Sequence, residues 1–277
     1  MCSGLRAVLP RYSFSYPSPL PPSPRQCRQV EGTPSRTAII LPQVVAPGTP
    51  ISTITPAIAR RFSLPPHCAV LAGTTDSIAA FLASGASQPG TAVTSLGSTL
   101  AIKLLSRSRL DDARYGIYSH RLGDLWLAGG ASNTGGAVLR HFFSDRELAN
   151  LSRHVPDIPS PFNYYPLLVP GERFPVNDPA LPPQMQPRPD DPTEFLHGLL
   201  DGIARIEAQG YHLLCALGAE PLSHVLTTGG GAQNTAWQRL RSRRLGVPVA
   251  QSVQSEAAYG TATLARRFAS SALDESR

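Results

Sequence analysis

Residues 224–245 read HVLTTGGGAQNTAWQRLRSRRL and are the stretch on which the fold prediction depends. They predict a strand at 224–228, a turn at 229–231 and a helix at 235–245. Three consecutive glycines let a backbone approach a ligand closely, and the N-terminus of the following helix favours polar or anionic groups. The pattern fits a nucleotide-binding turn, and it also fits an ordinary tight connection. It is neither a P-loop nor a G-x-G-x-x-G fingerprint.

The rest of the chain alternates predicted strands and helices, which favours an α/β fold. Further strands are predicted at 39–45, 69–72, 91–95, 100–105, 116–120, 125–128 and 247–250. Further helices are predicted at 56–62, 77–83, 137–143, 145–154, 192–217 and 256–268. A turn is expected at 47–50, and Gly129 and Gly130 are expected to leave the sheet toward the next helix. Residues 155–192 are rich in proline and predicted to be irregular.

Composition excludes several classes of protein. The formal charge is +6, but residues 1–30 hold four arginines and no acid, so the remainder carries about +2. This excess is too small to indicate a nucleic-acid partner or a membrane surface, and the arginines at 239–244 are expected to form a solvated helix face. The four cysteines lack zinc or redox spacing, which favours a reducing compartment. No apolar run approaches the ~18 residues of a membrane span.

The first 38 residues are rich in Pro, Ser and Arg and lack a sustained period. An Arg- and Ser-rich, acid-poor start is typical of an organellar transit peptide. It is equally typical of a segment without structure. Both alternatives stay open at this point.

Two further segments carry candidate chemistry. The turn LGSTL at 96–100 offers backbone amides and two hydroxyls that can hold a terminal phosphate, although an ordinary β-turn has the same composition. Asp76 lies at the mouth of a predicted strand-to-helix turn, where an acid is commonly a helix cap. A carboxylate there can also act as a general base that accepts a hydroxyl proton during phosphoryl transfer.

The order of these motifs resembles that of the FGGY carbohydrate kinases over roughly residues 41–268. The motifs are GTTDS at 73–77, SLGST at 95–99, GER at 171–173, GGGA at 229–232, LGVPV at 245–249 and EAA at 256–258. Within the family, GTTDSIAAF at 73–81, GGASNTGG at 129–136 and RFPVNDP at 173–179 look closest to the plant and cyanobacterial branch of xylulose kinase-like (D-ribulose kinase) proteins.

The resemblance implies a fold of actin-like (ribonuclease H-like) α/β domains that close over a cleft, and it implies roles for particular residues. Asp76 would be the catalytic base and, with Thr75, would contact the sugar. The implied ATP contacts are Gly97, Ser98 and Thr99 in a phosphate loop, Gly135 and Gly136 in a segment that lines the nucleotide site, and Gly230, Gly231 and Asn234 in the adenosine turn. ATP and Mg²⁺ are the implied cofactors, whereas Glu172 and Arg173 are expected to be structural.

One departure from the family concerns the first domain, which opens with an Asp-x-Gly-Thr-like turn in full members. Nothing in residues 1–60 resembles that turn. We therefore expect a disordered head at 1–38, a remnant of the first domain at 39–88, a nucleotide-binding C-terminal domain at 89–269 and a flexible tail at 270–277.

The expected activity is ATP-dependent phosphorylation of a ketopentose, D-ribulose or D-xylulose, by a truncated chain that needs a separate or missing first domain. The alternatives are a non-catalytic nucleotide-binding module, a regulatory partner, or an inactive remnant. The expected location is the chloroplast, with the cytoplasm as the alternative.

Overall fold

The structure is a computed structural model that describes residues 43–274, with side chains described as far as Arg266. The described residues fall into two compact units, one running up to Thr74 and resuming at Ala265, the other spanning Thr75–Leu264. The predicted head at 1–38 and the last three residues of the predicted tail lie outside the described part. The predicted domain boundaries follow the family's organisation and stay a prediction.

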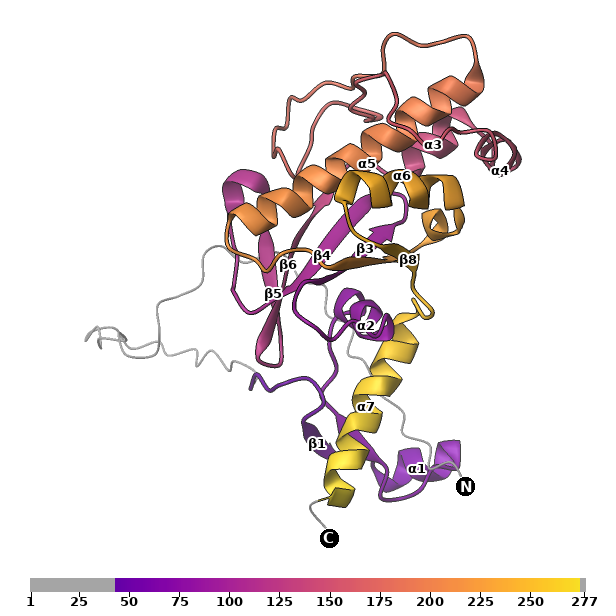
Figure 1. Cartoon of the computed structure of the whole chain (residues 1–277). Coiled ribbons are helices and arrows are strands. Elements are labelled where there is room, and N and C mark those ends of the chain that lie inside the picture. Colours follow the sequence, from indigo (N-terminus) through magenta and orange to yellow (C-terminus); the bar gives the residue numbers. More distant parts are fainter. Residues whose placement is uncertain (1–42, 275–277) are drawn as a thin grey trace, which may run out of the picture. The chain divides into compact units, whose positions relative to one another are not determined.

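The larger unit is built on a six-stranded mixed sheet (Figure 1). The strand order is β5 (Tyr118–Leu122), β6 (Leu125–Ser132), β4 (Leu100–Ser106), β3 (Thr91–Leu96), β7 (His224–Thr228) and β8 (Val249–Gln251). The first four strands pair antiparallel, whereas β7 runs parallel to β3 and β8 parallel to β7. Because Ser95 and Thr228 are in register, the turns that follow β3 and β7 leave the sheet at the same edge.

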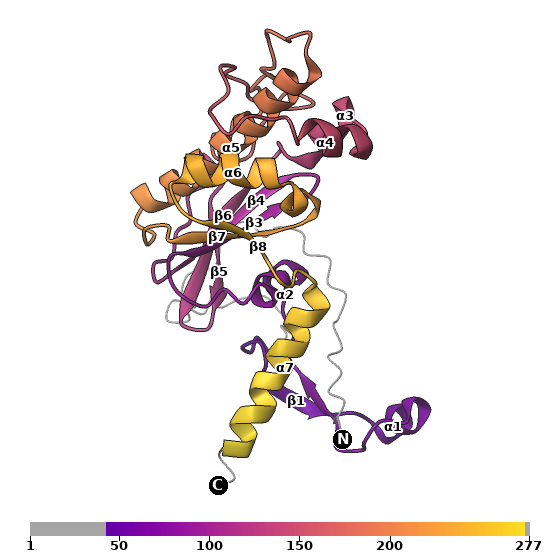
Figure 2. The ribbon, with the colours of Figure 1, turned by 45° about the vertical axis from the view of Figure 1, so that its right-hand side comes forward.

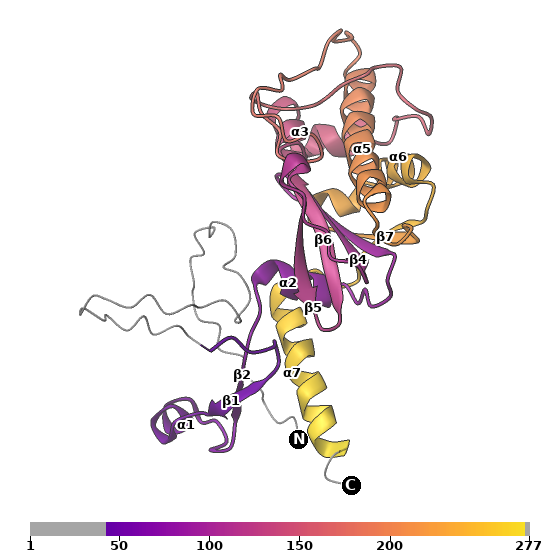
Figure 3. The same ribbon diagram turned by 90° about the vertical axis from the view of Figure 1, so that its left-hand side faces the viewer.

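Helices cover both faces of this sheet. α5 (Pro192–Ala216) and α6 (Thr235–Leu245) pack on one face, and α2 (Asp76–Ala83) lies on the other (Figures 1 and 2). Figure 3 shows the same arrangement from the side, with α3 (Gly136–Phe142) beside α5 and above the sheet in that view. The larger core lies under α5 and α6, while α2 contributes Ile78 and Phe81 to a smaller cluster with Val93, Leu105 and Leu127.

Two more helices complete the larger unit. α4 (Asp145–Leu151) begins with a capping box between Ser144 and Glu147. α7 (Ala257–Asp274) begins in this unit and passes close to α2, because a Cβ on Gly260 would collide with the Ala79 carbonyl. Residues 152–191 between α4 and α5 form no helix or ladder strand, which confirms the irregular structure predicted from position 155 onward, whereas the helix predicted at 145–154 ends earlier, at Leu151. Within residues 43–274, no helix combines the length and apolar content that crossing a bilayer requires.

In the smaller unit, β1 (Pro50–Thr53) pairs antiparallel with β2 (Ala69–Leu71), and α1 (Pro56–Phe62) connects them (Figure 3). Thr55 caps α1 by accepting a hydrogen bond from the Ile58 amide at 3.4 Å, and a proline occupies the first helical position, both as predicted. The predicted strand at 39–45 is wrong in its described part, because residues 43–45 are irregular. The chain turns at 47–48 and pairs only from Pro50 onward.

The expectation that Gly129 and Gly130 leave the sheet is also wrong, since both lie inside β6. A Cβ on Gly129 would collide with the Ile102 carbonyl of β4, and a Cβ on Gly130 would collide with the Phe174 ring. These glycines therefore permit close packing and do not mark a turn.

Arg241 contradicts the expectation that the arginines at 239–244 are all solvated. Its side chain is 1% exposed and pairs with the equally buried Glu207 of α5 through contacts of 2.6 and 2.7 Å. Glu207 also accepts a hydrogen bond from Thr94 of β3 at 2.5 Å, and Arg241 donates to Thr227 of β7 at 2.7 Å. One ion pair therefore joins two helices to two strands.

Arg241→Met should lower the free energy of unfolding by about 3–5 kcal/mol, because it leaves the Glu207 carboxylate buried without its partner. Urea denaturation measures the change. Arg243→Met is the matched control on the same helix: its ion pair with Asp157 is about half exposed on both sides, so about 0–1 kcal/mol is expected. Equal losses for the two variants would show that the buried pair has no special importance.

Candidate functional site

The turn between β3 and β4 packs directly against the start of α3. The amide of Gly136 donates to the Gly97 carbonyl at 2.9 Å, and the amide of Ala137 donates to the Ser98 carbonyl at 3.0 Å. Gly135 has φ +144°, and a Cβ there would lie 2.7 Å from the Thr99 Cα atom. The structure thus brings the predicted phosphate loop and the predicted glycine pair together, and only residues without a side chain permit this approach.

Arg140, which the sequence analysis missed, points at the same turn. Its Nη2 atom donates to Ser98 Oγ at 3.1 Å, and both side chains are exposed. Arg140 lies one helical turn after Gly136, so an arginine four residues beyond the glycine pair was the signal available in the sequence. A guanidinium beside backbone amides and a hydroxyl is suited to phosphate oxygens.

The turn after β7 ends in the N-terminus of α6. Gly229 has φ +83°, a short 3₁₀ helix spans Gly230–Gln233, and Asn234 caps α6 by accepting from the Trp237 amide at 3.0 Å. The Asn234 amide group also donates to Ser152 Oγ, just beyond α4, at 2.8 Å. Asn234 therefore holds the glycine turn and the end of α4 together.

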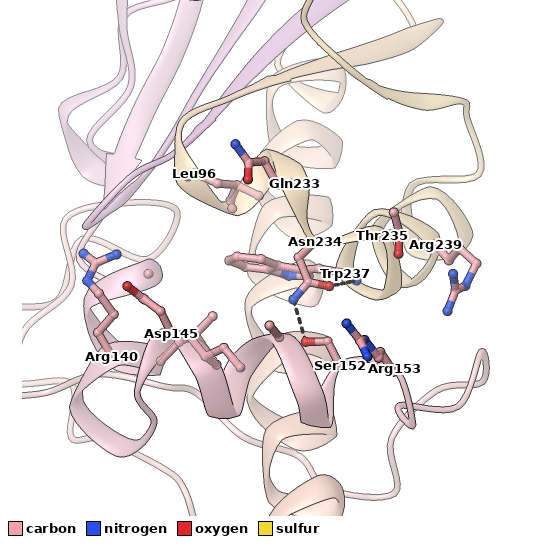
Figure 4. Close-up of a pocket in the computed structure, with 16 residues that line it drawn as sticks. Leu96, Arg140, Asp145, Ser152, Arg153, Gln233, Asn234, Thr235, Trp237 and Arg239 are labelled. Carbon is pink, nitrogen blue, oxygen red and sulfur yellow. Dashed lines mark hydrogen bonds between the residues drawn. The ribbon is translucent and has the colours of Figure 1, made fainter.

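A cavity of about 770 Å³ lies between these elements (Figure 4). Its wall includes four of the predicted residues, Gly136, Gly230, Gly231 and Asn234. Gly97, Ser98, Thr99 and Gly135 are not among its lining residues, and they reach the site through their contacts with α3 and Arg140. Trp237, which is 1% exposed, also lines the cavity and donates its indole N–H to the Leu200 carbonyl at 3.1 Å.

The cavity wall carries more positive than negative side chains. Arg140 lies at one end, Arg153 and Arg239 lie at the other, and Asp145 is the acidic side chain of the wall (Figure 4). All four are exposed, so their charges act on whatever enters the opening. A cavity with this charge balance and glycine walls is suited to an anionic ligand.

Asp76 occupies a different place. It is the first residue of α2, its Oδ1 atom accepts from the Ser77 amide at 2.6 Å, and its side chain is exposed. Thr75 takes the N-cap position, but its side chain forms no capping hydrogen bond. The cap alternative for Asp76 is thus wrong by one position. Neither Thr75 nor Asp76 lines the cavity, since α2 lies on the other face of the sheet.

Glu172 is a buried residue that holds the segment before Gly135 in place. Its carboxylate is 2% exposed and accepts from Ser132 Oγ at 2.5 Å and from the Asn133 and Arg173 amides at 2.7 and 2.8 Å. The Tyr165 hydroxyl donates to it at 3.0 Å, and the pKa of that hydroxyl is raised by burial first and by the Glu172 charge second. Glu172 thereby fixes the segment that leads from β6 to Gly135, in agreement with a structural role.

The described residues offer no dedicated metal site. Among them, no three His, Cys, Asp or Glu side chains gather closely enough to hold an ion.

Comparison with solved structures shows the fold. A xyloylose kinase from Brucella ovis aligns with a TM-score of 0.73 at 22% identity, over 83% of this chain and 49% of that one. A xylulose kinase from Bifidobacterium adolescentis aligns with a TM-score of 0.69 at 24% identity, over 84% of this chain and 47% of that one. Plasmodium falciparum glycerol kinase with ADP aligns with a TM-score of 0.66 at 14% identity, over 80% of this chain and 46% of that one. The chain spans about half the length of these proteins.

The sequence comparison gives the family. Residues 92–269 match the C-terminal domain of the FGGY family of carbohydrate kinases. Together with the mixed sheet and its helices, this match confirms the predicted α/β, actin-like ATPase fold. The chain therefore belongs to the FGGY family of carbohydrate kinases, and the matched residues correspond to that family's C-terminal domain.

Proposed function

We propose that this chain forms the nucleotide-binding half of an ATP-dependent kinase that phosphorylates a ketopentose, D-ribulose or D-xylulose. The observation that carries the proposal is the cavity of about 770 Å³ between the Gly229–Asn234 turn and α3, with three arginines on its wall. The pentulose is favoured by the motif GTTDSIAAF at 73–81 and by the xylulose kinases among similar structures.

In this proposal the nucleoside of ATP lies against Gly230 and Gly231, and its phosphates extend toward Arg140 and the Gly97–Thr99 turn. The glycines give the nucleoside flat backbone to lie on, because they place no side chain in the cavity. Arg140 and Ser98 then offer a guanidinium and a hydroxyl to the phosphate oxygens. Mg²⁺ belongs to the proposal as an ion held by the ATP phosphates, whose charge it neutralises.

The proposed reaction is a direct phosphoryl transfer. Asp76 accepts the proton of a sugar hydroxyl, the hydroxyl oxygen bonds to the γ-phosphorus, and the bond between that phosphorus and the β,γ-bridging oxygen breaks to release ADP. At the start of α2 the Ser77 amide donates to only one oxygen of the exposed Asp76 carboxylate, Oδ1, which leaves the second oxygen available for a proton.

A second function is favoured by one observation: Asp76 does not line the cavity. A chain that binds nucleotide without the opposing sugar-binding wall would act as a non-catalytic module or as the partner of a separate first domain. Purified protein whose melting temperature rises with ATP, yet which phosphorylates no pentose, would favour this alternative.

Arg140→Ala should weaken ATP binding by about tenfold to a hundredfold, since a hydrogen bond to a charged group contributes about 1.5–3 kcal/mol. Isothermal titration calorimetry with MgATP measures the change. Arg121→Ala is the control, because Arg121 lies beside Trp126 on β5–β6, outside the cavity. An unchanged affinity in Arg140→Ala would remove this residue from the phosphate site.

The neighbouring glycines of the turn should respond differently to alanine. Gly229→Ala should cost about 1–3 kcal/mol of stability, because φ is +83° there and a Cβ would lie 2.7 Å from the Leu96 carbonyl oxygen. Gly230→Ala meets no atom within 4 Å, so the fold should be unaffected while ATP binding weakens. Thermal unfolding and calorimetry on both variants separate the effects, and equal ATP affinity in Gly230→Ala and wild type would contradict the placement of the nucleoside.

Asp76→Asn should lower pentulose phosphorylation by about two to four orders of magnitude and leave ATP affinity unchanged. A coupled ADP-release assay and calorimetry on the same preparation measure the two quantities. Turnover within a few-fold of wild type would exclude Asp76 as the base. Absence of turnover in the wild-type chain would instead favour the non-catalytic alternative.

A further inference from the structure

The chain contains a single lysine, Lys103, and all its other basic side chains except histidine are arginines. Lysine and arginine differ in how their protonation responds to burial. The guanidinium of arginine keeps its proton throughout the physiological range, whereas the pKa of a lysine shifts readily with its surroundings. The position at which this chain uses its one lysine is therefore informative.

Lys103 lies near the middle of β4, on the sheet face that α2 covers. In the cross-strand row through Lys103, the neighbours on one side are Val93 of β3 and, beyond it, Leu226 of β7. On the other side is Gly129 of β6, which has no side chain, followed by Tyr118 of β5. The lysine is half-buried in a row that contains no other charge.

The ammonium group of Lys103 reaches the first turn of α2. Nζ donates a hydrogen bond to the Ser77 carbonyl at 2.8 Å. The amide of the same residue donates to Asp76 Oδ1 at 2.6 Å. The single lysine and the proposed base are thus joined through the two backbone groups of one residue, Ser77.

The charges around Lys103 come from three elements. Burial lowers the pKa of Lys103 from 10.5 to about 8, and the Asp76 carboxylate of α2 acts in the opposite direction. His120 of β5 has its own pKa lowered by burial and by the Lys103 charge, and Asp111, in the segment before β5, raises it. At neutral pH the immediate electrostatic partner of the ammonium is therefore Asp76.

The buried charge of Lys103 lowers the stability of the folded chain. Its pKa is lower in the folded chain than in the unfolded chain, so between about pH 8 and 10.5 the unfolded state binds more protons. Stability attributable to this group rises with pH through that window, and below about pH 8 the full cost of the buried charge is present.

We propose that Lys103 is a positioning residue of the acceptor site, which holds the first turn of α2 through the Ser77 carbonyl and supplies the cation that faces Asp76. The inference rests on the proposed function, since it assigns Lys103 to the same base. The ammonium would keep the Asp76 carboxylate oriented at the start of α2. Lysine suits this place because its head group donates to a carbonyl as a point charge on a flexible stem.

The single lysine makes the test direct, because ¹⁵N,¹³C-lysine labelling of the 277-residue chain yields one Nζ signal. Its titration by NMR should have a midpoint near pH 8 in wild type, and Asp76→Asn should move the midpoint to lower pH. Asp111→Asn is the matched control: its carboxylate acts on His120, so the Lys103 midpoint should stay in place. An unchanged midpoint in Asp76→Asn would overturn the proposal.

Thermal unfolding supplies the second measurement. Lys103→Met should raise Tm at pH 7, and its advantage over wild type should shrink between about pH 8 and 10.5 as the wild-type lysine loses its proton. A difference in Tm that stays the same from pH 7 to 10.5 would show that Lys103 carries no buried charge in this window and would overturn the proposal.

Kinetics keep this inference distinct from the proposed function. Lys103→Met should lower kcat for the pentulose at least tenfold with an unchanged KM for ATP, and an unchanged kcat would overturn the inference. A wild-type chain that phosphorylates no pentulose would count against the proposed function, whereas an Asp76-dependent Lys103 midpoint in that chain would still support the pairing of the two residues.

Discussion

The parallel, in-register pairing of β3 with β7 is the constraint on which the site depends. Thr94 and Thr227 are register partners, and each is hydrogen-bonded to a different member of the buried Glu207–Arg241 pair. Thr94 and Thr227 lie one residue before Ser95 and Thr228, the last register partners of the two strands. The Glu207–Arg241 ion pair therefore fixes how the phosphate turn and the glycine turn leave the sheet. A shift in this register would separate the two turns, and the cavity between them would lose its shape.

The fold was largely predictable because local signals and tertiary structure agree. The helix Thr235–Leu245, with Asn234 before it and Gly246 after it, ends where capping residues indicate. The sequence patterns gave wrong predictions where contacts with residues distant in the sequence determine the local structure. Gly129 is in a strand because β4 approaches its backbone, and Arg241 is buried because Glu207, on another helix, compensates its charge. Neither partner is visible in a short window of sequence.

The candidate site was predictable as a set of turns and less so as a geometry. Motif order placed Gly136, Gly230, Gly231 and Asn234, which all line the cavity. Arg140 was missed because an arginine on a helix is ordinary until the fold aims it at Ser98. Asp76 was found by its motif, but its separation from the cavity follows from the sheet lying between α2 and the helices α5 and α6. Sequence spacing carries no information about which face of a sheet an element covers.

The use of arginine in place of lysine has a consequence for the chemistry of the whole surface. Enzymes that acetylate or ubiquitinate protein side chains act on lysine amines, which the guanidinium of arginine does not replace. The side chain of Lys103 is half-buried and engaged with the Ser77 carbonyl. Among lysine side chains, this chain thus offers such enzymes one poorly accessible amine, and an enzyme that reached it would alter the surroundings of Asp76.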